Sequence, residues 1–156
     1  MSEGKFINWG TGGFGAGNWK IVYDIIRRFD VKTVIEYGCG VSTELFMAVG
    51  CKVISLETQT DYADIPGANI IVAPYDRFPG NMGTFDLAFI DGPGAYEFES
   101  KGLKPERRLS AYHAKRHSNL VYMHDGGLGQ EEAFESDPLW EKIGGHDTDL
   151  IYRKRT

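Results

Sequence analysis

The fold is decided by the stretch Thr33-Val34-Ile35-Glu36-Tyr37-Gly38-Cys39-Gly40-Val41-Ser42-Thr43. Its first five residues are β-branched or apolar around a single acid, which predicts a short buried strand. Gly38 and Gly40 then predict a tight turn, because glycine takes positive φ freely and lets the backbone approach a ligand. Ser42 or Thr43 would cap a helix that ends at Gly50. The stretch therefore indicates a strand, a glycine turn and a helix in succession.

The same alternation repeats along the rest of the chain. Further helices are expected over residues 18–30, 103–117 and 131–143, and further strands over residues 52–57, 68–73, 85–91, 119–124 and 149–154. Apolar strand cores separated by helices predict an α/β fold with a mostly parallel sheet covered on both faces. We expect a three-layer, Rossmann-like sandwich of about six strands in the order 3-2-1-4-5, with the last strand beside the fifth. Residues 1–156 are interpreted as one domain.

Composition narrows the possible partners and the compartment. The net charge is −5 and no basic block exceeds Arg153-Lys154-Arg155, which disfavours nucleic acid as an obligatory partner. No apolar run approaches the ~20 residues of a membrane helix, and residues 1–5 lack the layout of a signal peptide. Cys39 and Cys51 are interpreted as reduced thiols. We expect a cytoplasmic protein without membrane association.

Acidic residues end most of the predicted strands. The first ends in Glu36 and the glycine turn, the second in Glu57, the fourth in Asp91 and the fifth in His124-Asp125. Ligands of parallel α/β sheets bind beyond the carboxyl ends of the strands. A row of carboxylates at one edge gives the sheet itself no advantage, whereas a ligand rich in hydroxyl and ammonium groups would use them all.

These segments together resemble the class I S-adenosylmethionine-dependent methyltransferases. Residues 34–43 resemble the first motif of that family, an acid followed by a Gly-x-Gly turn, and Glu57 matches its ribose-binding acid. Residues 85–93 and 119–126 resemble the segments of its fourth and fifth strands. The resemblance extends over residues 18–128 and implies S-adenosylmethionine as cofactor and methyl transfer, with O-methylation of a small molecule as the expected reaction.

The resemblance also implies a set of cofactor-binding residues: Glu36, Gly38, Cys39, Gly40, Glu57, Thr58, Asp76 and Asp91. Glu36 would accept a hydrogen bond from the amino group of the methionine moiety, directly or through water. Glu57 would accept hydrogen bonds from both ribose hydroxyls, and Asp76 would receive the adenine amino group. A sulfonium cofactor is positively charged, whereas a pyrophosphate is negatively charged. An acidic edge of the sheet therefore favours the sulfonium cofactor over a dinucleotide.

For catalysis we expect His124 to act as the general base, since its pKa lies naturally near neutrality, with Asp125 as the second candidate. In catechol-type O-methyltransferases, positions that match Asp91 and Asp125 hold a divalent cation. The amide ligand expected next is replaced by Gly126, and the lysine expected shortly after Asp91 is absent. We therefore predict no metal site, and keep Mg²⁺ held by Asp91 and Asp125 as the alternative.

Three further features have competing interpretations. The glycine-rich segment 10–17 matches a dinucleotide-binding pattern, but no good strand precedes it, so we expect residues 1–17 to form a cover over the cofactor, with a plain surface loop left open. His113 and His117 have the spacing of metal ligands on a helix, yet the basic residues around them favour a solvated face. Arg107 and Arg108 are interpreted as surface charge, with a contact to a substrate carboxylate left open.

The C-terminal part appears short, because the family carries two strands after its fifth helix and residues 149–154 supply one. A truncated substrate-binding end would favour the alternative function, a non-catalytic S-adenosylmethionine-binding or regulatory domain. If the chain is an active enzyme, we expect a small-molecule acceptor and no nucleic-acid partner. The sequence leaves homo-oligomerisation open.

Overall fold

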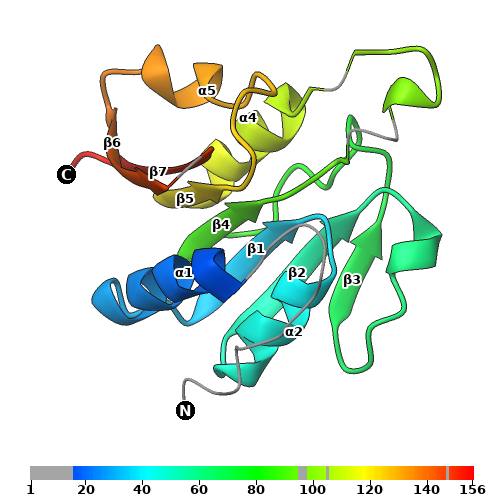
Figure 1. Ribbon diagram of the computed structural model, residues 1–156, viewed down its shortest axis with the longest axis horizontal. Coiled ribbons are helices and arrows are strands. Elements are labelled where there is room, and N and C mark those ends of the chain that lie inside the picture. The colour runs from blue at the N-terminus through cyan, green and yellow to red at the C-terminus, as the bar shows by residue number, and fades with distance from the viewer. Residues whose placement is uncertain (1–15, 95–97, 105, 147) are drawn as a thin grey trace.

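The computed structural model describes residues 16–94, 98–104, 106–146 and 148–156. Its strands are β1 (Thr33–Tyr37), β2 (Lys52–Glu57), β3 (Asn69–Val72), β4 (Leu87–Ile90), β5 (Leu120–Met123), β6 (Trp140–His146) and β7 (Asp149–Lys154). They form one seven-stranded sheet in the order β3-β2-β1-β4-β5-β7-β6 (Figure 1). The first five strands pair in parallel, and β7 runs antiparallel to both β5 and β6.

Helices cover both faces of this sheet. They are α1 (Ala16–Arg28), α2 (Val41–Ala48), α4 (Arg108–His117) and α5 (Glu132–Glu135), with a short 3₁₀ turn, η2, at Thr60–Tyr62. Successive residues of β1 point to opposite faces: Val34 packs in the core with α1 and α2, and Ile35 packs in the core with α4 and α5. Buried aromatic rings such as Trp19 and Phe46, 5.3 Å apart, fill the α1–α2 side. The predicted three-layer α/β sandwich is confirmed.

The predicted sheet order and the place of the last strand beside β5 are also confirmed, but the C-terminal end is longer than expected. Residues 131–143 were predicted to be helical with an interruption at Asp137-Pro138, whereas α5 ends at Glu135 and β6 follows from Trp140. Asp137-Pro138 ends the helix, and the Trp140 ring then packs 4.8 Å from Phe134 as β6 pairs with β7. The sheet therefore has seven strands rather than about six, and both strands after α5 are present.

The ends of the strands agree with the predicted ends to within about two residues. The starts of the helices differ from the predicted starts by more. Helix α1 begins at Ala16, so Asn18 lies inside its first turn instead of capping it, and α4 begins at Arg108 rather than near residue 103. The predicted cofactor cover comprises residues 1–17, of which residues 1–15 lie outside the described residues. Among the described residues, no helix is both long and apolar enough to cross a bilayer.

Candidate functional site

The carboxyl ends of the parallel strands and the first residue of β7 lie along one edge of the sheet (Figure 1). Glu36, near the end of β1, is fully buried there. Its carboxylate accepts hydrogen bonds from the hydroxyls of Ser42 and Thr43 in α2 and, at 2.8 Å, from Ser55 in β2. Burial raises the pKa of Glu36 to about 7, against the three hydroxyl donors that lower it. Glu36 thus ties together the strands and the helix beneath the glycine turn.

The glycine turn packs directly on the end of β4. Gly38 has φ +89°, and a Cβ added there would lie 2.9 Å from the carbonyl oxygen of Asp91. A Cβ on Gly92 would in turn lie 3.0 Å from the Cα of Gly38. Gly40 is extended, with φ 162°, and no atom of the described residues lies within 4 Å of an added Cβ. The predicted positive φ therefore lies in the left-handed region at Gly38, whereas Gly40 is extended, a conformation that does not require glycine.

Glu57, the last residue of β2, is buried beside the same turn. Its Oε1 accepts from the backbone N–H of Cys39 at 3.2 Å, and its Oε2 accepts from those of Thr58 at 2.7 Å and Gln59 at 3.1 Å. Burial and the Glu57 carboxylate raise the pKa of the Cys39 thiol to about 12, which leaves it protonated and unreactive at neutral pH.

A hollow opens between the ends of β1, β2 and β4, which we call the strand-end hollow. It is lined by Tyr37, Gly38, Leu56, Glu57, Thr58, Phe78, Gly92 and Pro93. The structure thus brings Gly38, Glu57 and Thr58 to one hollow. Asp76 is exposed in the loop after β3 and does not belong to this lining. Asp91 also lies apart from it.

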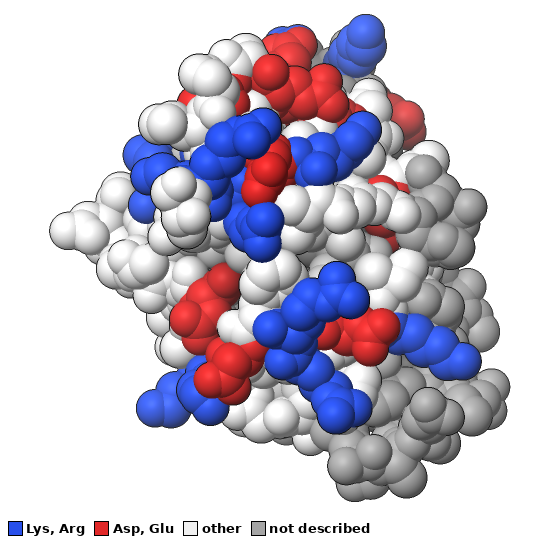
Figure 2. Space-filling model, turned by 90° about the vertical axis from the view of Figure 1, so that its left-hand side faces the viewer, with Lys and Arg blue, Asp and Glu red and all other residues white. Residues whose placement is uncertain are grey.

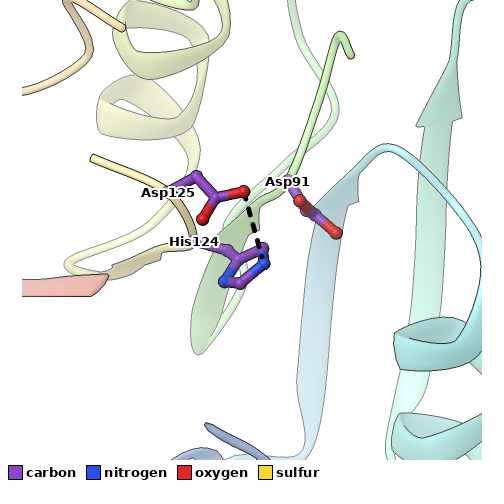
Figure 3. A group of neighbouring side chains, drawn as sticks. All are labelled: Asp91, His124 and Asp125. Carbon is purple, nitrogen blue, oxygen red and sulfur yellow. Dashed lines mark ion pairs between the residues drawn. The ribbon is translucent and has the colours of Figure 1, made fainter. Parts of the chain in front are cut away.

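Asp91 belongs instead to a second group with His124 and Asp125, which we call the His124 cluster (Figure 3). One potential ligand atom from each of the three lies within 4.8 Å of the others. Nε2 of His124 lies 3.5 Å from Oδ2 of Asp125. The His124 side chain is 7% exposed and that of Asp125 is 58% exposed, so the cluster reaches from the interior to the surface.

Behind His124 lies Asp149, a residue that the sequence analysis did not identify. Oδ1 of Asp149 accepts a hydrogen bond from Nδ1 of His124 at 2.9 Å. Burial alone would lower the pKa of His124, but this hydrogen bond and the charges of Asp91, Asp149 and Asp125 raise it above its usual value. The sequence offered one indication of Asp149, its position at the start of the last predicted strand. An antiparallel strand beside β5 begins where β5 ends, so its first residue lies next to His124.

Arg107 is buried as well, which corrects its interpretation as surface charge. Its guanidinium donates to the carbonyl oxygens of Pro93 at 3.0 Å and His124 at 2.9 Å, and lies 3.8 Å from Asp91. Burial raises the pKa of Asp91 to about 6, although His124 and Arg107 oppose the shift. Arg107 therefore joins the segments that follow β4 and β5. Arg108 is half-exposed and pairs with Glu132 at 2.9 Å.

His113 and His117 were predicted to lie on a solvated face, and this is wrong: both are buried, with their rings stacked 4.2 Å apart. The Tyr37 hydroxyl lies 2.7 Å from Nδ1 of His113, and the Pro79 carbonyl lies 2.6 Å from its Nε2. Both histidines lie on the face of α4 that packs against the sheet with Ala111 and Ala114. The spacing of these buried residues along the helix, and not the basic residues beside them, determines that the face is buried. Burial lowers the pKa of His113 to about 4.

No protein-family model matches the chain, and no curated protein matches it in sequence. Solved structures do match in fold. A Pyrococcus horikoshii protein proposed to be an RNA methyltransferase aligns with a TM-score of 0.66 and 15% identity, over 95% of this chain and 89% of its own. A Staphylococcus aureus protein proposed to be a caffeoyl-CoA O-methyltransferase gives 0.63 and 16%, over 88% and 82%.

An O-methyltransferase from Bacillus cereus, solved with S-adenosylhomocysteine, gives a TM-score of 0.62 and 12% identity, over 95% of this chain and 85% of its own. At such identities the likeness concerns the fold. This chain has the class I methyltransferase fold.

Proposed function

We propose that this chain is an S-adenosylmethionine-dependent methyltransferase that binds its cofactor at the strand-end hollow and its acceptor beside the His124 cluster. The observation that carries the proposal is the pairing of two different sites at one sheet edge. One is a hollow with a buried carboxylate at its side, and the other is a histidine backed by an aspartate. When bound, S-adenosylmethionine supplies a methyl group on a sulfonium centre that a nucleophile can displace directly.

The residues of the strand-end hollow fit the cofactor. Leu56 and Phe78 are the apolar side chains that would pack against an adenine ring, but the hollow has room for little more than a water molecule and must widen to admit the cofactor. Among the described residues, none fills the space beside Gly40, next to the turn. Glu57 would accept hydrogen bonds from ribose hydroxyls in exchange for donors that it has now, since Oε1 already receives the N–H and the thiol of Cys39 and Oε2 receives the N–H groups of Thr58 and Gln59. Glu36 would act by holding this turn in place.

At the His124 cluster, Nε2 of His124 would take the proton of an acceptor hydroxyl as the oxygen attacks the methyl group. General-base catalysis of this kind contributes roughly 10²–10⁴-fold, and alignment of the two reactants contributes the rest. We assign O-methylation on this basis, with Asp125 as the exposed group that would contact the acceptor.

A small-molecule acceptor fits the distribution of charge. On the face shown in Figure 2, basic and acidic side chains lie interspersed. Arg153 and Arg155 of the terminal basic block both pair with Glu141, at 2.7 and 3.3 Å. The single Glu141 carboxylate offsets part of the positive charge of this block, which weakens the block as a contact for a phosphate backbone.

The proposal is tested by calorimetric titration of the full chain with S-adenosylmethionine and S-adenosylhomocysteine, followed by a screen of hydroxyl acceptors. We expect micromolar binding of both. The alternative of a non-catalytic binding domain would give cofactor binding without transfer to any acceptor, but its main support, a truncated C-terminal end, is absent from the fold.

A second candidate is a cation-dependent reaction, favoured by the convergence of Asp91, His124 and Asp125. Histidines that ligate metals usually donate their other ring N–H to a carboxylate, as His124 does to Asp149. One imidazole with two carboxylates would suit a transition ion better than Mg²⁺. The buried guanidinium of Arg107 beside Asp91 opposes it, since it already brings positive charge to the group. Loss of turnover with EDTA and recovery with Mn²⁺ or Mg²⁺ would establish this candidate.

A further inference from the structure

The carboxylate of Asp149 is the most densely hydrogen-bonded group near the His124 cluster. It is the first residue of β7, is 1% exposed, and lies where β7 pairs antiparallel with β5. Its Oδ1 accepts from Nδ1 of His124 at 2.9 Å and from the backbone N–H of Asp125 at 3.1 Å. Its Oδ2 accepts from the side-chain amide of Asn18 at 2.8 Å and from the hydroxyl of Tyr122.

These four donors decide what Asp149 can do. A carboxylate has about four acceptor positions, so Asp149 has no capacity left for a substrate or an ion. A buried carboxylate is tolerated when donors from the protein replace the water it has lost. Here the donors come from helix α1, strand β5 and the segment after β5, so the carboxylate is fixed from three directions. Its effect on chemistry therefore passes through His124.

The contact with His124 fixes which ring nitrogen carries the proton. A carboxylate can only accept, and Asp149 lies at hydrogen-bond distance from Nδ1, 2.9 Å, whereas Asp125 lies 3.5 Å from Nε2. The proton of a neutral His124 ring is therefore assigned to Nδ1. Nε2 is then left with its lone pair, facing Asp125 and the exposed side of the cluster (Figure 3). The charged groups around the ring are Asp91, Asp125 and Asp149, with the Arg107 guanidinium on the His124 carbonyl.

We infer that Asp149 is the positioning residue of His124: it holds the ring in the Nδ1–H tautomer and directs Nε2 toward the acceptor. The inference concerns the ring itself, and its catalytic consequence rests on the proposed function. An Nδ1–H ring held by a carboxylate could act either as a general base or as a metal ligand through Nε2. The measurement is therefore made on metal-free protein, in which Nε2 carries no metal ion.

The decisive measurement is long-range ¹H–¹⁵N NMR of the His124 ring in the full, EDTA-treated chain, at a pH alkaline enough to keep the ring neutral. We expect the Nδ1–H tautomer. Asp149→Asn is the informative variant: with its amide oxygen kept on Asn18 and Tyr122, its NH₂ faces Nδ1 and donates to it, and the hydrogen bond from the Asp125 N–H is lost. His124 should then change to the Nε2–H tautomer. Tyr122→Phe is the matched control, since it removes a donor from Oδ2 and should leave the tautomer unchanged.

Once an acceptor is known, Asp149→Asn should lower kcat by up to about 10⁴-fold, the loss seen when a triad aspartate is made neutral. The KM for S-adenosylmethionine should not change. An Nε2–H tautomer in the unaltered chain, or an unchanged tautomer in a folded Asp149→Asn protein, would overturn the inference. If Asp149→Asn fails to fold, the tautomer of His124 in the unaltered chain and in Tyr122→Phe still tests the inference. The absence of methyl transfer would refute the proposed function and leave the tautomer result standing.

Discussion

The two halves of the candidate site are built in different ways. At the strand-end hollow, each carboxylate is held largely by its own neighbourhood: Glu36 by hydroxyls six and seven residues later, and Glu57 by the next two backbone N–H groups. At the His124 cluster, the partners are distant, with Asp149 25 residues from His124 and Asn18 131 residues from Asp149. The first half combines these local contacts with two that join β1 and its glycine turn to β2, Ser55 to Glu36 and Cys39 to Glu57, which are 19 and 18 residues apart. The second half depends on the contacts of the Asp149 carboxylate, which join segments that are 24 or more residues apart.

This difference predicts separable effects, of which the largest belongs to the His124 cluster. His124→Ala should reduce kcat on the order of 10²–10⁴-fold through loss of the general base, and should leave cofactor affinity unchanged. Steady-state kinetics with an identified acceptor, measured with and without EDTA, would check this. Full loss of turnover with EDTA together with an active His124→Ala protein would contradict the base assignment and favour the cation.

The strand-end hollow should respond in the opposite way. Glu57→Ala should weaken S-adenosylmethionine binding by ~1.5–3 kcal/mol, the range for a hydrogen bond to a charged group, while the His124 tautomer stays the same. Asp76→Ala is a useful comparison, because Asp76 is exposed and outside the lining of the hollow. Equal titration curves for Glu57→Ala and the unaltered chain would remove Glu57 from the cofactor site.

The glycine turn offers a matched pair that separates stability from binding. Gly38→Ala should lower the free energy of unfolding by ~1–3 kcal/mol, since φ is +89° and the new Cβ would meet the Asp91 carbonyl. Gly40→Ala should change stability much less, because its φ is extended and the space beside it is open. Urea unfolding of both variants checks this. Similar losses in the two would show that the turn is strained at both positions.

The smallest effect concerns the buried histidine pair. The pKa of His113 is about 4 in the folded chain and near 6.5 unfolded, so the unfolded state binds more protons below pH 6.5. Stability should therefore fall by about 1 kcal/mol between pH 7 and pH 5.5 because of this group. Glu36, with its pKa raised to about 7, acts in the opposite sense, being favourable below pH 4.5 and unfavourable as pH rises toward 7.

The contribution of His113 can be isolated as the difference between the unaltered chain and His113→Gln. The variant should show a flatter fall in its free energy of unfolding on acidification. Parallel pH profiles for the two proteins would mean that His113 takes up its proton equally in both states.

What could be read from the sequence follows the same division. The order of the sheet, Glu57 beside the glycine turn and the strand-end residues His124 and Asp125 were predictable, because they depend on local periodicity and on the rule that parallel strands end at one edge. Asp149 was not, since its role depends on an antiparallel pairing between segments 25 residues apart.

The remaining errors have the same origin. Residues 140–146 become a strand because β7 provides an edge to pair with and Phe134 provides a surface for Trp140. Arg107 and His113 are buried because carbonyls of Pro93 and Pro79, each in a distant loop, accept their hydrogen bonds. In each case a tertiary partner outweighs the local composition, which on its own indicates an exposed or helical segment.

The central claim, a cofactor site at the ends of β1, β2 and β4, is tested most directly by side-by-side calorimetric titration of S-adenosylhomocysteine into the unaltered chain, Glu57→Ala and His124→Ala. We expect one micromolar site in the unaltered chain, binding at least about tenfold weaker in Glu57→Ala, and unchanged binding in His124→Ala. No binding to the unaltered chain, or binding that His124→Ala weakens and Glu57→Ala leaves intact, would contradict it.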